Sequence, residues 1–258
     1  MLSELLAGAL EDAETRRQEV SLRQIENLAT EAPAALDAFE LLQPAEQVRI
    51  IAEVKRSSPS RGMLAEIPDP AALAKLYEIG GASAISVLTE GRKFGGSLQD
   101  LAAVRAAVNI PVLRKDFIGE AYQVFEARAA GADMVLLIVA ALTDQKLGEL
   151  YTLITELGMC ALVETHDASE VSRAIDLGAN VIGVNARNLS TFELDQSLFG
   201  RLADQIPAGV IRVAESAVTS SEDVARYRAD GADVVLVGEA LVTGDPVSTL
   251  ASFLAVES

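Results

Sequence analysis

Residues 120–139 read EAYQVFEARAAGADMVLLIV, and this stretch decides the fold. Residues 120–130 carry apolar side chains at helical spacing, whereas Met134–Val139 is a short unbroken apolar run. Such a run is typical of a strand that is buried on both faces of a parallel sheet. Gly131-Ala132 separates the two segments, at a place where glycine suits the left-handed end of a helix. The stretch therefore predicts a helix followed by a buried parallel strand.

The same Gly-Ala pair recurs before other apolar runs. It stands at Gly81-Ala82, Gly131-Ala132, Gly178-Ala179 and Gly231-Ala232, so the glycines are 50, 47 and 53 residues apart. Each interval is long enough for two strand–helix units. The repeat therefore indicates a chain built from βα units, doubled along the sequence.

Eight apolar runs are expected to be strands. They are Arg49–Val54, Ala84–Leu88, Pro111–Leu113, Met134–Val139, Ala161–Val163, Val181–Val184, Val210–Ala214 and Val234–Val237. Segments with helical spacing lie between them, as at Ser97–Val108 and Ser220–Ala229. Eight units without a linker predict a closed (β/α)8 TIM barrel of the α/β class, and 258 residues suit such a barrel.

Residues 1–48 precede the first expected strand and are expected to form a helical extension. Met1–Leu10 is apolar, Glu11–Glu19 is charged, and Leu22–Leu28 again has helical spacing. The segment is not a ninth unit, and it is expected to cap one end of the barrel. Residues 49–258 would form the barrel itself, as the remainder of one domain.

The composition excludes several classes of function. A net charge of −17 without a basic tract argues against nucleic-acid binding. The single cysteine, Cys160, and the single histidine, His166, argue against disulfides and against a Cys or His metal site. Met1–Leu10 contains Glu4 and lacks a basic leader, and no apolar stretch is long enough to span a membrane. A cytoplasmic protein is expected.

Polar residues stand at the ends of seven of the eight expected strands. In a TIM barrel the carboxyl ends of the strands form the active site. Because side chains alternate along a strand, several of these residues are expected to share the inner face with the apolar residue two positions earlier. The residues expected to converge are Glu53, Lys55, Lys115, Glu164, Asn185 and Glu215. Such a cluster shifts pKa values and suits acid–base catalysis, whereas Arg114 is expected on the opposite face.

The last two expected strands indicate an anion site. Glu215-Ser216 and Gly238-Glu239 stand at the ends of strands seven and eight, where barrels of this kind hold phosphate. Gly238 allows a ligand to approach the backbone closely. The basic loop Lys55–Gly62 follows the first strand and is placed to close over a phosphate or a carboxylate.

The sequence resembles the indole-3-glycerol-phosphate synthase family over essentially the whole chain. Six motifs in family order carry the resemblance. They are Ile51–Ser60, Ser86–Glu90 with Phe94–Ser97, Pro111–Phe117, Ala161–His166, Ile182–Leu189 and Val213–Ser216. The N-terminal extension is similar to the helical cap over the barrel mouth in that family.

The resemblance implies ring closure of 1-(2-carboxyphenylamino)-1-deoxyribulose 5-phosphate to indole-3-glycerol phosphate, carbon dioxide and water. It implies that Lys115 is the general acid of ring closure and that Glu164 assists proton loss in dehydration. Lys55 lies near the substrate anions and is a second candidate acid in dehydration, whereas Glu53 and Asn185 orient the lysines. The substrate-binding residues it implies are Ser57, Phe94, Phe117, Arg187, Glu215, Ser216, Gly238 and Glu239. No cofactor or metal is implied, and association with other enzymes of the pathway stays open.

Two positions depart from the family pattern. Ala217 stands where the family often has glycine, and the acidic Glu239 must point away from a bound phosphate. Phe94 and Phe117 fit either a ring-packing role or a core role. His166 is expected in a loop or behind the site, and Cys160 is expected as a small buried residue at the start of the fifth strand.

Three rival functions remain open from the sequence. One is another phosphate-binding barrel such as phosphoribosylanthranilate isomerase, which by resemblance needs a cysteine–aspartate pair. A second is a Schiff-base aldolase that uses Lys115. The third is a non-catalytic barrel, against which the intact Lys55, Lys115 and Glu164 argue.

Overall fold

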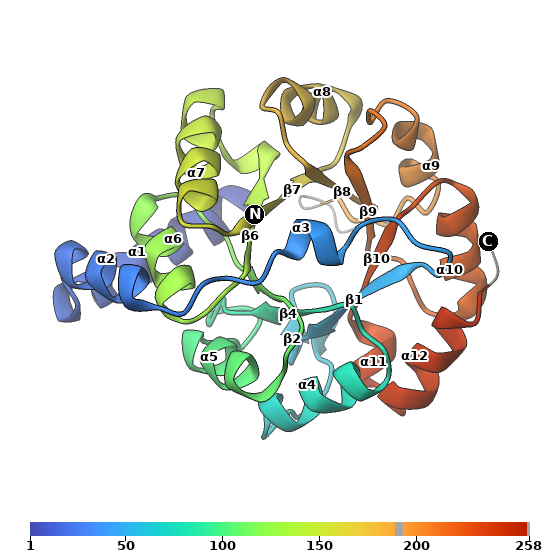
Figure 1. The fold of residues 1–258 in the computed structure, drawn as a ribbon, viewed down its shortest axis with the longest axis horizontal. Helices are drawn as coiled ribbons and strands as arrows, with labels where there is room; N and C mark the ends of the chain where they lie inside the picture. The colour runs from blue at the N-terminus through green and yellow to red at the C-terminus, as the bar shows by residue number, and fades with distance from the viewer. Residues whose placement is uncertain (189–192, 257–258) are drawn as a thin grey trace.

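The computed structural model describes residues 1–188 and 193–256, so Leu189 lies outside the described residues. Within these residues, eight parallel strands close into a barrel, and their order follows the chain (Figure 1). Pairing of Ile51 with Leu236 joins the first strand to the last. The barrel strands are β1 Arg49–Val54, β4 Ala84–Leu88, β5 Val112–Lys115, β6 Met134–Ile138, β7 Cys160–Thr165, β8 Val181–Asn185, β9 Ile211–Glu215 and β10 Val234–Val237. The expected (β/α)8 TIM barrel is confirmed.

Helices surround the barrel on its outer side (Figure 1). They are α4 Pro70–Ile79, α5 Leu98–Ala107, α6 Ala121–Ala129, α7 Asp144–Glu156, α8 Ala168–Asp176, α9 Leu198–Ala203, α10 Ser221–Ala229, α11 Glu239–Val242 and α12 Pro246–Leu254. A short 3-10 helix, Val139–Ala141, follows β6. In the described parts of the chain, no helix has the length and apolar character needed to cross a membrane.

All eight apolar runs form strands, and four strands continue beyond the expected ends. They extend through Lys115, Thr165, Asn185 and Glu215. The backbone of these polar residues is still part of the barrel ladder, for example where Asn185 pairs with Glu215. A polar side chain at a strand end therefore marks the mouth of the barrel and not the end of the strand.

The four glycines of the Gly-Ala repeat have left-handed backbones. Their φ angles are 94° at Gly81, 88° at Gly131, 79° at Gly178 and 91° at Gly231. Each one follows the last turn of a helix, namely α4, α6, α8 and α10. The repeat thus marks the helix ends of every second βα unit.

Two apolar layers hold the barrel together. The inner layer contains Ile51, Leu113, Leu162 and Leu236, which are buried inside the barrel. The outer layer joins the other face of the strands to the helices and includes buried valines, leucines and isoleucines of both. Cys160 begins β7 as expected but is only half-buried. Alternation along each strand assigns the side chains to these layers.

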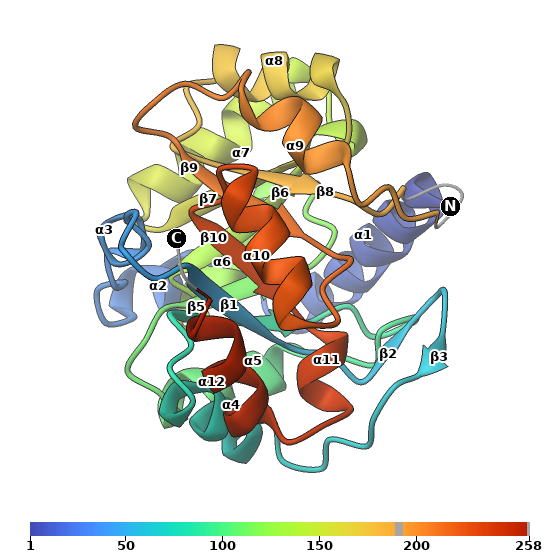
Figure 2. The same ribbon diagram turned by 90° about the vertical axis from the view of Figure 1, so that its right-hand side faces the viewer.

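The N-terminal extension lies at both ends of the barrel. Its helices are α1 Leu2–Glu19, α2 Leu22–Glu31 and α3 Ala38–Leu41. In Figure 2, α1 lies at the end from which the hairpin β2 Ser57–Ser58 and β3 Gly62–Met63 projects, and α3 lies at the opposite end. Leu5 of α1 and Leu42 beyond α3 are both buried against the inner layer. The apolar and charged halves of α1 form one continuous helix.

Candidate active site

A cavity of about 200 Å³ opens at the carboxyl ends of the barrel strands. Twelve of the thirteen expected site residues line it: Glu53, Lys55, Phe94, Lys115, Phe117, Glu164, Asn185, Arg187, Glu215, Ser216, Gly238 and Glu239. The thirteenth, Ser57, does not line the cavity, and its hydroxyl donates instead to the carbonyl oxygen of Lys93 at 2.8 Å. In this structure Ser57 therefore fixes its own loop.

Lys115 lies between two buried carboxylates. Its Nζ is 3.2 Å from Oε2 of Glu164 and 3.5 Å from Oε2 of Glu215. The side chains of Glu164 and Glu215 are each 1% exposed, whereas that of Lys115 is 14% exposed and reaches the cavity. The ammonium group is thus held in place by β7 and β9 and remains accessible to a ligand.

The two carboxylates beside Lys115 differ in pKa. Burial would raise the pKa of Glu164, but the charges of Lys115 and His166 outweigh it and hold this pKa well below its ordinary value. Burial and the neighbouring Glu164 raise the pKa of Glu215 to about 8. Burial lowers the pKa of Lys115, yet the surrounding carboxylates more than offset this and leave it above its ordinary value. The site thus pairs an ionised carboxylate and a protonated lysine with a carboxyl group that is neutral near pH 7.

Lys55 and Glu53 form a second ion pair on the inner face of β1. A side chain at position 238 would collide with this pair, because a Cβ there would lie 2.6 Å from Oε2 of Glu53 and 2.9 Å from Nζ of Lys55. Gly238 was expected to admit a ligand, and the structure shows that its lack of a side chain makes room for the ion pair. A Cβ at Gly183 would similarly collide with Oε1 of Glu215.

Asn185 connects strands β8 and β9 at the mouth. Its Oδ1 accepts a hydrogen bond from Oγ of Ser216 at 2.8 Å and another from the backbone N–H of Arg187 at 3.0 Å. Ser216 and Ala217 both have left-handed backbones, with φ angles of 69° and 56°. This conformation favours glycine, which gives a physical reason for the glycine that the family often has at the place of Ala217.

An ion pair crosses the mouth between the loop after β1 and the start of α11. Arg61 donates to the carboxylate of Glu239, which accounts for the acidic residue at the expected phosphate end. Burial and the nearby charge of Arg61 lower the pKa of Arg187. Arg61 and Arg187 thus bring two guanidinium groups to the same part of the cavity.

The loop after β4 positions an aromatic wall. The buried carboxylate of Glu90 accepts hydrogen bonds from the backbone N–H groups of Arg92, Lys93 and Phe94 at 2.7–2.9 Å. Phe94 thereby comes to face Phe117, with 6.1 Å between the ring centroids and 42° between the rings. Both rings line the cavity, so they contact the core and are also available to a planar ligand.

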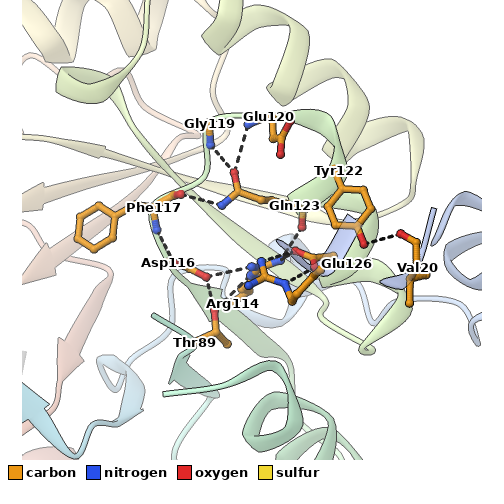
Figure 3. A network of polar contacts seen from close by, with 11 residues as sticks. Val20, Thr89, Arg114, Asp116, Phe117, Gly119, Glu120, Tyr122, Gln123 and Glu126 are labelled. Atoms are coloured by element: carbon orange, nitrogen blue, oxygen red, sulfur yellow. Dashed lines mark hydrogen bonds and ion pairs between the residues drawn. The ribbon is translucent and has the colours of Figure 1, made fainter. Parts of the chain in front are cut away.

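Arg114 lies behind the site on the outer face of β5, as alternation predicted. Figure 3 shows it among Asp116, Gln123 and Glu126, with no exposed surface. It donates to Oδ2 of Asp116 at 2.9 Å and to the carbonyl oxygen of Gln123 at 2.6 Å. Glu126 in turn accepts from Nη2 of Arg16 in α1 at 2.8 Å. This network joins the N-terminal extension to the strand that carries Lys115.

Sequence reasoning did not single out two residues that line the cavity. Leu5 lines it from α1, and Arg61 lines it from the loop after β1. His166 was expected in a loop or behind the site, and it lies just after β7, outside the main cavity, with 3.2 Å between its Nε2 and Oε1 of Glu164. The basic character of the loop was the only signal for Arg61 in the sequence.

The fold and the mouth together define a class of protein. Lysines and carboxylates with shifted pKa values converge in a cavity at the carboxyl ends of the strands, beside two arginines and an aromatic wall. This arrangement is that of a TIM-barrel enzyme that performs acid–base chemistry on a small anionic substrate.

Comparison with known proteins gives the particular family. The family model described as indole-3-glycerol phosphate synthase matches residues 2–252. A protein of that name from Leifsonia xyli subsp. xyli is 66% identical over 256 residues, which cover 99% of this chain and 98% of the relative. Another from Parafrankia sp. (strain EAN1pec) is 57% identical over 95% of this chain and 91% of the relative. The chain belongs to the indole-3-glycerol phosphate synthase family.

More distant solved structures share the fold. An N-acetylmannosamine-6-phosphate 2-epimerase from Clostridium perfringens has a TM-score of 0.63 at 14% identity, over 81% of this chain and 92% of that chain. A thiamine phosphate pyrophosphorylase from Pyrococcus furiosus has a TM-score of 0.58 at 12% identity, over 81% of this chain and 94% of that chain. At such identities the likeness concerns the barrel alone.

Proposed function

We propose that this chain converts 1-(2-carboxyphenylamino)-1-deoxyribulose 5-phosphate to indole-3-glycerol phosphate, carbon dioxide and water in tryptophan biosynthesis. Family membership supports this reaction, and one observation in the site carries it. That observation is the ammonium group of Lys115, held between Glu164 and Glu215 and open to the cavity.

Ring closure is assigned to Lys115. The ring carbon that bears the carboxylate attacks the ketone carbon, a C–C bond forms, and the carbonyl electron pair moves to oxygen. Lys115 gives a proton to this oxygen, which lowers the barrier because charge develops there. The carboxylate then leaves as carbon dioxide, and its bonding electrons restore the aromatic ring.

Dehydration is assigned to the two ion pairs of the mouth. The new hydroxyl leaves as water after it accepts a proton, while a proton is lost from the neighbouring carbon. The ionised Glu164 is the proton acceptor, and Lys55 or Lys115 supplies the proton to the hydroxyl. Glu53 orients Lys55 through their ion pair, and Asn185 orients Ser216 through a hydrogen bond.

Substrate anchoring is assigned to opposite parts of the cavity. The phosphate binds beside Ser216 and Gly238, with Arg187 and Arg61 as nearby cations. The anthranilate ring packs on Phe94 and Phe117. Anchors at both ends fold the flexible sugar chain so that the ring carbon meets the ketone, which removes much of the entropic barrier. Glu215 is a neutral supporting group.

We also propose a role for the N-terminal extension and a location for the enzyme in the cell. Residues 1–48 act as a cap on the barrel of residues 49–258, and Leu5 contributes to the cavity wall. A cytoplasmic location is proposed because a substrate with a phosphate and a carboxylate does not cross membranes unaided.

The rival functions fit the site less well. A Schiff-base lysine must be neutral to attack a carbonyl, whereas the pKa of Lys115 is raised by its carboxylate neighbours. Cys160, which an isomerase would need at the mouth, begins β7 and lies near Asp37 at the other end of the barrel. Borohydride trapping with a ketose phosphate is expected to leave Lys115 unmodified.

The proposed function is tested by incubation with the anthranilate-derived ribulose phosphate. We expect indole fluorescence to appear together with one carbon dioxide per product. Inorganic phosphate at millimolar concentration should raise the apparent KM and leave kcat unchanged. Absence of product from folded protein would refute the proposed reaction, and an unmoved KM would refute the proposed anion site.

A further inference from the structure

His166, the single histidine of the chain, lies between two carboxylates. Its Nε2 is 3.2 Å from Oε1 of Glu164, and its Nδ1 is 3.1 Å from Oε2 of Glu170. The same Oε2 accepts the backbone N–H of His166 at 2.8 Å. The His166 side chain is only 13% exposed, so water competes little for these contacts.

The geometry around the ring favours its protonated form. Carboxylates accept hydrogen bonds and do not donate them, so a nitrogen that faces one must carry a proton. Nδ1 is within hydrogen-bond distance of Glu170, and Nε2 is buried at ion-pair distance from Glu164 without the alignment of a hydrogen bond, so both contacts favour the imidazolium. In agreement, Glu164 and Glu170 outweigh burial and raise the pKa of His166 to about 10.

The contacts of Glu164 give this cation a function. Glu53, Glu164 and Glu215 are buried at the mouth, Glu215 as a neutral carboxyl group, and Lys55 and Lys115 supply two positive charges. His166 supplies a third, and it does so on the oxygen of Glu164 that Lys115 does not contact. Lys115 and His166 thus hold one oxygen each.

We propose that His166 is a positioning residue that keeps Glu164 ionised and fixes its orientation toward Lys115 and the cavity, with Glu170 holding the ring in place. This inference rests on the proposed function, because it assigns His166 to the proton acceptor of that reaction. His166 does not line the main cavity and acts only through Glu164.

Other charged groups around His166 are consistent with a cation there. Glu164 faces it from β7, Glu170 faces it from the first turns of α8, and Asp167 lies beside it at the start of α8. From the segment after β8, Glu193 and Asp195 line the cavity that His166 also lines. Glu164 and Glu170 are the two that favour the imidazolium by contact, whereas Asp195 is paired with Arg201.

The pairing can be measured without any assay of activity. Because the chain has one histidine, its imidazole 15N signals are assigned without ambiguity. We expect both ring nitrogens to remain protonated at pH 8 in the wild type. Glu164→Gln and Glu170→Gln should each lower the pKa of His166 by about one unit or more. A wild-type ring that titrates near its ordinary value of 6.5 would overturn the proposal even if the enzyme makes product.

The effect on Glu164 is measured through the pH profile of kcat. His166→Gln keeps an N–H donor but removes the charge, so the acidic limb of the profile should move up by about one unit. His166→Ala should move it at least as far and also lower kcat. Ser169→Ala, an exposed change that alters only a contact with Asp167, is the matched control and should leave the profile in place. An unmoved limb in folded His166→Gln would overturn the proposal, whereas absence of product in every variant and in the wild type would refute the proposed function instead.

Discussion

Two glutamates at the mouth show how one kind of side chain acquires two protonation states. Glu164 touches two cations, Lys115 and His166, and its pKa is lowered. Glu215 has Lys115 alone within ion-pair distance among the described residues, and its pKa is raised to about 8. Ring closure needs a proton donor and dehydration needs a proton acceptor, so this asymmetry suits a reaction with both steps.

Ala217 provides a test of backbone strain at the residue scale. Its φ of 56° is unfavourable for alanine by about 1–2 kcal/mol, and this exceeds the extra entropy of glycine in the unfolded chain, about 0.5–1 kcal/mol. Ala217→Gly should therefore raise the melting temperature. Ala103→Gly, in the right-handed helix α5, should lower stability by about 1 kcal/mol and serves as the control. The same sign for both changes would refute the strain argument.

Alternation along strands was enough to place the single residues that face inward. Lys115, Glu164 and Glu215 were expected on the inner face, and all three line the cavity. Contacts made by loops could not be predicted in this way, because neither period nor spacing fixes where a loop side chain points. Ser57 was expected in the cavity, but its hydroxyl donates to the carbonyl oxygen of Lys93 in the loop after β4. Arg61 was not singled out, although it pairs with Glu239.

At the scale of elements, β5 and α6 are joined by a buried ionic network around Arg114 (Figure 3). Arg114→Ala would leave Asp116 and Glu126 buried with fewer partners, and should lower the free energy of unfolding by about 3–5 kcal/mol. Lys146→Ala breaks an exposed pair with Glu149 and should cost less than about 1 kcal/mol. Urea denaturation of both variants checks this difference, and equal losses would contradict it.

The loop after β1 and helix α11 meet through Arg61 and Glu239. If Arg61 also helps to bind the substrate phosphate, Arg61→Ala should raise KM about fivefold, the equivalent of about 1 kcal/mol for a partly exposed charge. Its kcat should change little. Glu239→Gln removes the competing carboxylate and should lower KM. Steady-state kinetics of both variants decides the matter, and a lower KM in Arg61→Ala would contradict the assignment.

The elements themselves were predictable because buried parallel strands are apolar runs. All eight runs became strands, and the four repeat glycines became left-handed helix ends. The hairpin β2–β3 was not predicted, since two short pairings such as Ser57 with Met63 leave no period in the sequence. The ends of some strands were predicted too early, because polar residues such as Thr165 still pair with the neighbouring strand.

At the scale of the whole molecule, the extension binds the barrel at both ends, with α1 at the mouth and α3 opposite (Figure 2). Arg92 of the β4 loop pairs with Asp12 of α1, and Arg16 pairs with Glu126 of α6. The sequence predicted a cap at one end only. An apolar helix must be covered by some surface, but its sequence does not reveal which surface covers it. The connection between α2 and β1 lies at the amino ends of the strands (Figure 2), where the backbone N–H of Leu36 donates to Asp133 just before β6.

The raised pKa of His166 makes the stability of the whole chain depend on pH. The folded state holds a proton up to a pKa of about 10, whereas the unfolded chain loses it near 6.5. The stabilisation is therefore complete below pH 6.5 and is lost as the pH rises through 10. Glu164 acts in the opposite sense, since its lowered pKa makes stability fall as the pH drops below its ordinary value. His166→Gln should flatten the fall between pH 6.5 and 10 in thermal denaturation, and an unchanged slope would contradict the linkage.

The most direct test is the single-turnover rate of Lys115→Met, measured on a sample with the same folded fraction as the wild type. Loss of the general acid should reduce the appearance of indole fluorescence by ~10²–10⁴-fold. Lys75→Met removes an exposed lysine of α4 and should react as the wild type does. If Lys115→Met forms indole-3-glycerol phosphate at the rate of Lys75→Met, then Lys115 does not protonate the ketone and the account of ring closure is wrong.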